Sequence, residues 1–240
     1  MNTEVSWPRD QGVIGVLGVA PMATADFFMK LADRPVHKDW DHARVFIDSN
    51  PKIPSRGRFL ELGETDPVPY LREGITGLLN LGATVVAIPC NTAHIFYERY
   101  SAGFDSCIPN MIDLVAEKAK AHNLVSPLVL ASKATINHEL YTRAFHKLGI
   151  QSIDFPDQGL VSQAIEMVKQ NRHDSEICER IKRAVASFDG VDSVVLGCTE
   201  LGMVVPQIES LFLLDSNKIL ADFCVDYIMG TSSVEVVDFK

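Results

Sequence analysis

The chain is short of positive charge. Its 240 residues contain 22 Lys and Arg against 31 Asp and Glu, which gives a formal net charge of −9 at pH 7. Proteins that bind nucleic acid neutralise phosphates with a basic surface, so this balance argues against a nucleic-acid partner. It also means that local cations would have to meet an acidic ligand.

Membrane and targeting signals are also lacking. With 47% hydrophobic and 22% charged residues, the composition is that of a globular chain without a membrane span. Residues 12–23 are nearly all apolar and end in Ala23-Thr24-Ala25, which imitates the core and cleavage site of a signal peptide. The preceding residues carry Glu4 and Asp10 against the single Arg9. Because a signal peptide needs a positive leader, we expect a buried strand here and a cytoplasmic protein.

Cofactor signals are missing as well. The five cysteines are odd in number and include no Cys-x-x-Cys pair, which is typical of reduced thiols in a reducing compartment. The seven histidines show no paired helical spacing with Asp or Glu, so no metal site is predicted. No lysine motif for a pyridoxal Schiff base stands out. The residues themselves thus indicate no cofactor.

Strand and helix patterns alternate along the chain, which predicts parallel sheets covered by helices. The expected strands lie near 13–17, 43–47, 83–88, 126–131, 151–155, 192–196 and 211–214. The expected helices lie near 22–32, 67–81, 91–100, 111–122, 136–148, 159–170, 174–188 and 216–229.

Two segments combine a buried strand pattern with a cysteine at its end. In residues 83–94 the β-branched run leads to Cys90, and in residues 192–201 a similar run leads to Cys198. The small polar residues that follow suit the start of a helix. Each thiol is therefore expected at the carboxyl end of a parallel strand, where open α/β sheets bind ligands. Two equivalent lobes would place these thiols on opposite sides of one crevice.

A pair of facing thiols suits the inversion of an α-carbon. One group must remove a proton from one face while a similar group delivers a proton to the other face. Cysteine has an ordinary pKa of about 8.5, which a helix N-terminus or a cation can lower into the range of a general base. Asn91, Thr92 and Thr199 would supply polar groups beside the thiols. The pattern predicts a two-base racemase.

A single cysteine after a strand is more often a core residue than a catalyst. Cys178 and Cys224 lie within helical patterns, and Cys107 precedes a short Ile-Pro segment, so we interpret these three as packing residues. Cys90 and Cys198 differ from them because they share matching contexts.

The motifs around both cysteines resemble those of the aspartate/glutamate racemase superfamily. Residues 90–94 (Cys-Asn-Thr-Ala-His) and 197–201 (Gly-Cys-Thr-Glu-Leu) are similar to its two signatures, and the closer likeness is to the aspartate racemase branch. Residues 14–28 resemble the opening strand, loop and helix of that branch, and residues 50–56 resemble its second-strand loop. The likeness continues through Thr135 and residues 214–216.

The resemblance implies a fold, a substrate and a set of site residues. It implies an α/β fold of two similar Rossmann-like lobes with a pseudo-two-fold relation, with the active site in the crevice between them. It also implies a homodimer that needs no cofactor and acts on a small-molecule amino-acid substrate, aspartate or glutamate. The catalytic residues would be Cys90 and Cys198; the substrate-binding residues would be Arg56, Asn50, Asn91, Thr92, Ser132, Thr135, Lys169, Thr199 and Glu200.

Several of these assignments have alternatives. Arg56 would hold a carboxylate, as its counterpart does in the family. Lys169 could contact substrate or be a solvated lysine at a helix end. Glu200 could orient a partner or simply favour a helix N-terminus, and His94 could tune the thiol of Cys90 or pack within its helix.

The chain also departs from the family pattern. The family's loop Gly-Gly-Met-Gly-Pro is here the shorter Gly18-Val19-Ala20-Pro21, which could reshape the substrate pocket. Two alternatives follow from this change: a broad-specificity racemase of neutral or basic amino acids, and a binding homologue without turnover.

The lobes are expected to be discontinuous in sequence. The break near 107–110 predicts the first crossover, and Pro206 predicts the return. The first lobe would comprise 1–108 with 207–240, so that the last strand and helix rejoin it, and the second lobe would comprise 109–206.

Overall fold

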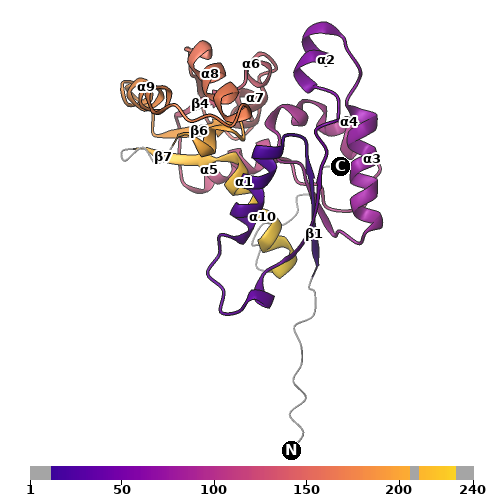
Figure 1. Ribbon diagram of the computed structural model, residues 1–240. Coiled ribbons are helices and arrows are strands. Elements are labelled where there is room, and N and C mark those ends of the chain that lie inside the picture. The colour runs from indigo at the N-terminus through magenta and orange to yellow at the C-terminus, as the bar shows by residue number, and fades with distance from the viewer. Residues whose placement is uncertain (1–11, 206–210, 231–240) are drawn as a thin grey trace, which may run out of the picture.

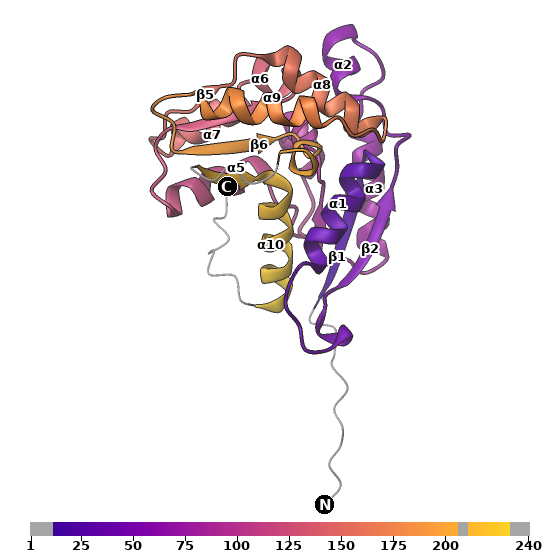
Figure 2. The ribbon, with the colours of Figure 1, turned by 60° about the vertical axis from the view of Figure 1, so that its left-hand side comes forward.

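The computed structural model describes residues 12–205 and 211–230 and contains two parallel sheets (Figures 1 and 2). Their strands are β1 (Val13–Gly18), β2 (Arg44–Ser49), β3 (Val85–Ala87), β4 (Pro127–Ala131), β5 (Ile153–Asp154), β6 (Ser193–Gly197) and β7 (Phe212–Asp215). The first sheet has the order β2-β1-β3, and the second has the order β5-β4-β6-β7. All of these pairings are parallel.

The two sheets repeat one strand order. In each, the earliest strand pairs with the next strand of the chain on one side and with the third on the other, and the second sheet adds β7 at its edge beside β6. The third strands are β3 and β6, which lead to Cys90 and Cys198. The predicted α/β fold of two similar lobes with parallel sheets is confirmed.

Helices cover the sheets, as the alternating pattern predicts. The α-helices are α1 (Pro21–Ala32), α2 (Arg56–Leu62), α3 (Val68–Asn80), α4 (Tyr97–Ser101), α5 (Met111–Ala121), α6 (Lys133–Asn137), α7 (Leu140–Lys147), α8 (Gln158–Lys169), α9 (Ser175–Ala186) and α10 (Ser216–Met229). Short 3₁₀ helices span Asp39–Asp41, Asn91–Phe96 and Leu201–Met203. In the described part of the chain, none of the helices combines the length and apolar character that crossing a bilayer requires.

Strands β1 and β6 form the cores of the two lobes. On one face of β1, Leu17 packs with Leu71 and Ile75 of α3; on the other, Ile14 and Val16 pack with α1 and α10. Strand β6 likewise has all five residues buried between helices on both faces. Burying each such side chain contributes about 1.5–3 kcal/mol, which is why continuous β-branched runs mark these central strands.

Three local differences from the sequence expectation have physical causes. The helix expected over 91–100 begins as a 3₁₀ helix, Asn91–Phe96, before α4. The helix expected over 136–148 is two helices, because Glu139 adopts a left-handed conformation with φ 53° between α6 and α7. The short helix α2 was not predicted; Ser55 caps its start, and Gly63 ends it in the left-handed region with φ 66°.

The C-terminal segment divides its contacts between the lobes. The sequence interpretation placed both its strand and its helix with the first lobe. The strand expectation is wrong, since β7 pairs with β6 in the second sheet. The helix α10 does pack on the first lobe, against α1 and β1 (Figure 2). The predicted lobe boundary at residues 206 and 207 lies outside the described residues, and the division itself stays a prediction.

Candidate active site

The two cysteine segments approach each other at the carboxyl ends of their strands. Cys198 directly follows β6, and Cys90 lies three residues after β3. Both are half-buried free thiols. They are near enough for charge on Cys90 to raise the pKa of Cys198, which places them in one electrostatic environment.

A buried carboxylate accepts a hydrogen bond from the Cys198 thiol. Cys198 Sγ donates to Glu200 Oε2 at 3.0 Å, and Thr199 Oγ1 donates to the same oxygen at 3.0 Å. Glu200 is only 5% exposed. Burial raises the pKa of Cys198 well above its ordinary value, and the charge and hydrogen bond of Glu200 raise it further. The Cys198 thiol is therefore protonated at neutral pH.

We expect Glu200→Gln to shift the alkylation of Cys198 by iodoacetamide to lower pH. A neutral amide no longer opposes the negative charge of the thiolate, so the pKa of Cys198 falls and the thiolate forms earlier as pH rises. The rate at Cys198 is measured against pH by peptide mass spectrometry. Thr199→Val, which removes the neighbouring hydrogen bond but keeps the carboxylate, serves as the control. An unchanged Cys198 profile in Glu200→Gln would contradict the assignment of Glu200 to this thiol.

His94 does not supply a cation to Cys90. The ring is buried, stacks on Tyr97, and its Nδ1 lies 2.9 Å from the Cys90 carbonyl oxygen, so it contacts the backbone of Cys90. Burial lowers the pKa of His94 to about 4. The ring is neutral at physiological pH, which favours the packing alternative over an electrostatic effect on the thiol.

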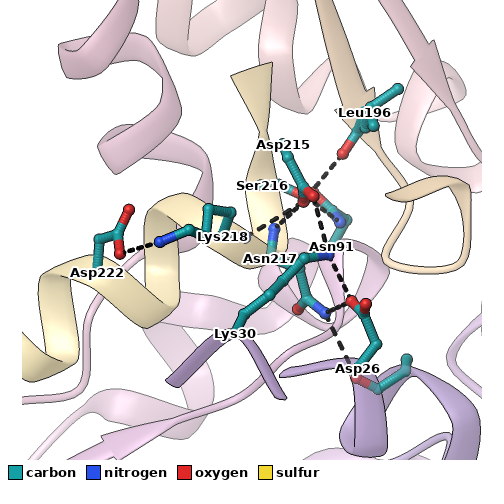
Figure 3. A network of polar contacts seen from close by, with 10 residues as sticks. Asp26, Lys30, Asn91, Leu196, Asp215, Ser216, Asn217, Lys218 and Asp222 are labelled. Carbon is teal, nitrogen blue, oxygen red and sulfur yellow. Dashed lines mark hydrogen bonds and ion pairs between the residues drawn. The ribbon is translucent and has the colours of Figure 1, made fainter. Parts of the chain in front are cut away.

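Asn91 connects the Cys90 segment to the second lobe. Its Nδ2 donates to Ser216 Oγ at 3.0 Å, and Ser216 Oγ donates to the Leu196 carbonyl oxygen of β6 at 2.7 Å (Figure 3). On its other side, Tyr141 OH donates to Asn91 Oδ1 at 2.5 Å. Both ends of the Asn91 amide are thus used within the protein.

Three hydroxyl groups form a second connection between the lobes. Thr92 Oγ1, in the first lobe, lies 3.0 Å from Ser132 Oγ and 3.4 Å from Thr135 Oγ1, which follow β4. Ser132 and Thr135 are 3.0 Å apart, and Ser132 caps α6 by accepting from the Thr135 amide. This cluster brings together three of the predicted site residues.

The loop after β2 orders itself around Arg56. Arg56 Nη1 donates to the carbonyl oxygens of Ile53 at 3.3 Å and Pro54 at 3.0 Å. Its Nε is buried and has no hydrogen-bond partner among the residues that the structure describes. Asn50 is part of the same loop: its amide donates to the Gly18 carbonyl, and its Oδ1 accepts from the Lys52 amide at 3.0 Å.

The chain is similar to a known family and to several proteins of known structure. The family model described as Asp/Glu/hydantoin racemase matches residues 16–224, which include both cysteine motifs. The chain belongs to this family.

Individual relatives agree with that membership. The broad-specificity amino-acid racemase RacX of Bacillus subtilis is 26% identical over 235 residues, which cover 92% of this chain and 100% of that protein. The Picrophilus torridus aspartate racemase superposes with a TM-score of 0.83 at 28% identity, over 91% of this chain and 94% of that one. An aspartate racemase homologue from Pyrococcus horikoshii, with a TM-score of 0.74 and 21% identity over 91% and 99% of the two chains, shows the same fold.

Hydrogen bonds join the Cys90 segment to Ser132 and Thr135, two of the predicted residues, but Lys169 takes no part in these contacts. Lys169 is exposed and ends α8. Among the described residues, no hydrogen bond or ion pair joins it to the cysteine segments. Its predicted contact with substrate stays a prediction.

Sequence reasoning missed two buried residues of this site, Tyr141 and Ser216. Ser216 lies within the stretch 214–216 that resembles the family, but nothing in the sequence pairs it with Asn91, which is 125 residues away. Tyr141 lies within a helical pattern of the sequence, and that pattern alone does not predict a contact with the site. Among the described residues, no group of three or more His, Cys, Asp and Glu side chains is arranged to hold a metal ion.

Proposed function

We propose that this chain is a cofactor-independent amino-acid racemase that inverts Cα with Cys90 and Cys198. The observation that carries the proposal is the pair of thiols at the ends of two equivalent strands. One of these thiols, Cys198, donates a hydrogen bond to a buried carboxylate. Membership of the racemase family and the relatives described above support it.

Two proton transfers make up the reaction. The Cys90 thiolate takes the proton from Cα, and the electron pair of that C–H bond stays on Cα as a carbanion. The Cys198 thiol then gives its proton to the opposite face of Cα, so the product carries the inverted configuration. Cys90 ends as a thiol and Cys198 as a thiolate, which is the state that accepts the opposite enantiomer. Glu200 favours protonated Cys198 and thereby favours Cys198 as the first acid.

We propose aspartate or glutamate as substrate, with Arg56 as the carboxylate ligand. Its Nε is buried without a partner among the described residues, and a charge-assisted hydrogen bond to a carboxylate would satisfy it. Asn50 and the hydroxyl groups of Thr92, Ser132, Thr135 and Thr199 would orient the remaining polar groups of the substrate. Asn91 is committed to Tyr141 and Ser216, so we assign it to the support of the site.

A broad-specificity racemase of neutral or basic amino acids is the second candidate. The full-length match to a broad-specificity racemase favours it, and so does the shortened loop of residues 18–21. Val19 of this loop packs in the apolar core with Ile53 and Ile88, where the family pattern has a glycine-rich loop. Because the carbonyl oxygen of Ile53 accepts a hydrogen bond from Arg56, this packing lies beside the Arg56 loop.

Incubation of the purified protein with each L-amino acid in deuterated water, without added cofactor, tests the proposal. We expect deuterium at Cα of the substrate together with formation of the D enantiomer, measured by NMR and chiral chromatography. Uptake confined to aspartate and glutamate supports the first candidate, and uptake across neutral or basic amino acids supports the second. No exchange with any amino acid would contradict the racemase and favour a binding homologue.

We also propose a homodimer in the cytoplasm, on the resemblance to the family. Light scattering after gel filtration measures the mass in solution. A monomer at micromolar concentration would contradict the dimer.

A further inference from the structure

Tyr141, on α7, touches both cysteine segments at once. Its side chain is 1% exposed. Its hydroxyl donates to Oδ1 of Asn91, the residue after Cys90, at 2.5 Å. Its ring lies against Gly197, the residue before Cys198: a Cβ placed on Gly197 would come within 2.7 Å of Tyr141 Cε2. One rigid ring therefore fills the space between the neighbours of the two thiols.

The contacts of Tyr141 are part of a closed network of interactions around this space. Asn91 continues through Ser216 to the carbonyl oxygen of Leu196, which precedes Gly197 in β6 (Figure 3). The hydrogen bonds at Oδ1 and Nδ2 fix the orientation of the Asn91 amide. The Cys90 segment is thus tied to β6 twice, once through Ser216 and once through Tyr141. Because buried hydrogen bonds are costly to leave unmade, this closed arrangement resists a change in spacing.

We propose that Tyr141 is a positioning residue that sets the separation between Cys90 and Cys198. The inference rests on the proposed function, in which the substrate Cα must fit between the two sulfur atoms. The Tyr141 hydroxyl is already used by Asn91, so Tyr141 acts through its neighbours without touching the substrate. Burial raises the pKa of Tyr141, which keeps the phenol protonated as a hydrogen-bond donor at all working pH values.

Tyr141→Phe tests the hydroxyl while it keeps the ring against Gly197. We expect kcat to fall ~10–100-fold with KM changed less than about twofold, because a small misplacement of reacting groups costs rate far more than binding. We also expect more exchange of the Cα proton per inversion in deuterated water, since the carbanion is then more often reprotonated from the same side, by a thiol whose proton has been replaced by solvent deuterium. A purely structural loss of active protein would lower kcat without changing this ratio.

Tyr100→Phe is the matched control. Tyr100 is also fully buried, but its hydroxyl has no hydrogen-bond partner within the described part of the chain, so its removal deletes the same atom without breaking a hydrogen bond seen there. We expect Tyr100→Phe to keep the parental ratio of exchange to inversion. Thermal unfolding of both variants shows whether each remains folded at the assay temperature.

A second measurement needs no racemase activity. Dibromobimane links two facing thiols, and peptide mass spectrometry identifies the Cys90–Cys198 product. We expect slower cross-linking in Tyr141→Phe than in the parent and in Tyr100→Phe. Ser216→Ala, which breaks the same network of contacts at another point, should also slow cross-linking. It replaces Tyr141→Phe if that variant does not fold.

The outcomes separate this inference from the proposed function. Parental cross-linking and a parental exchange ratio in folded Tyr141→Phe and Ser216→Ala would overturn the role of Tyr141. A parent protein that racemises no amino acid would contradict the proposed function, while slower cross-linking in Tyr141→Phe would still support the effect of Tyr141 on thiol spacing.

Discussion

Replacement of either Cys90 or Cys198 by alanine is expected to abolish racemisation in a folded protein. The reaction needs an acceptor on one face of Cα and a donor on the other, and each variant keeps only one of them. Loss of one well-placed acid or base costs ~10²–10⁴-fold in rate. Chiral chromatography of the product, with far-UV circular dichroism as a check of folding, measures the effect. Cysteine→serine should fail as well, because a hydroxyl is a far weaker base.

Deuterium exchange separates the two variants further. The remaining thiol can still exchange the Cα proton of the enantiomer whose proton it faces. We therefore expect exchange without inversion in opposite enantiomers for Cys90→Ala and Cys198→Ala, which assigns each thiol to one enantiomer.

Cys107→Ala is the control for these substitutions. Cys107 is also a half-buried free thiol, but it packs on the core of the first lobe with Cys224. Its removal should leave the racemisation rate near the parental value. A folded Cys90→Ala or Cys198→Ala variant that retained more than about a hundredth of that rate would contradict the two-base assignment.

The fold was predictable where burial is imposed by local sequence. Strands β1, β4 and β6 are covered on both faces, so their apolar runs are continuous and easily recognised. The pairing of β7 was not predictable, because the sheet that a strand joins depends on contacts made outside it. The break between α6 and α7 was also hidden, since Glu139 is a good helix former held in a left-handed conformation by its surroundings.

The cysteines of the candidate site and their polar neighbours were predictable, but the residues that contact them from distant parts of the sequence were not. Cys90, Cys198 and their polar neighbours lie within a few residues of a strand end, so chain position alone places them at the carboxyl edge of their sheets. Tyr141 reaches Asn91 across 50 residues, and Thr92 reaches Ser132 across 40. Such contacts depend on how the two lobes pack against each other, which local patterns in a single sequence do not predict.

The guanidinium of Arg56 is held in place by its own loop. One nitrogen, Nη1, is used by the carbonyl oxygens of Ile53 and Pro54, which fixes the plane of the group. Within the described residues, Nε is buried and unpaired. A substrate carboxylate would satisfy this nitrogen through a charge-assisted hydrogen bond, with the planar group already oriented.

We expect Arg56→Lys to lower kcat/KM about 10- to 100-fold, since a hydrogen bond to a charged group is worth about 1.5–3 kcal/mol. Lysine keeps the charge but lacks the planar fork and cannot hold the loop carbonyls and a carboxylate together. Arg58→Lys is the matched control, because Arg58 lies on the same helix in an exposed pair with Glu64. Steady-state kinetics on aspartate and glutamate measure both variants. If Arg56→Lys and Arg58→Lys show the same near-parental kcat/KM, Arg56 serves the loop alone, and the carboxylate must be bound elsewhere, with the exposed Lys169 as the next residue to test.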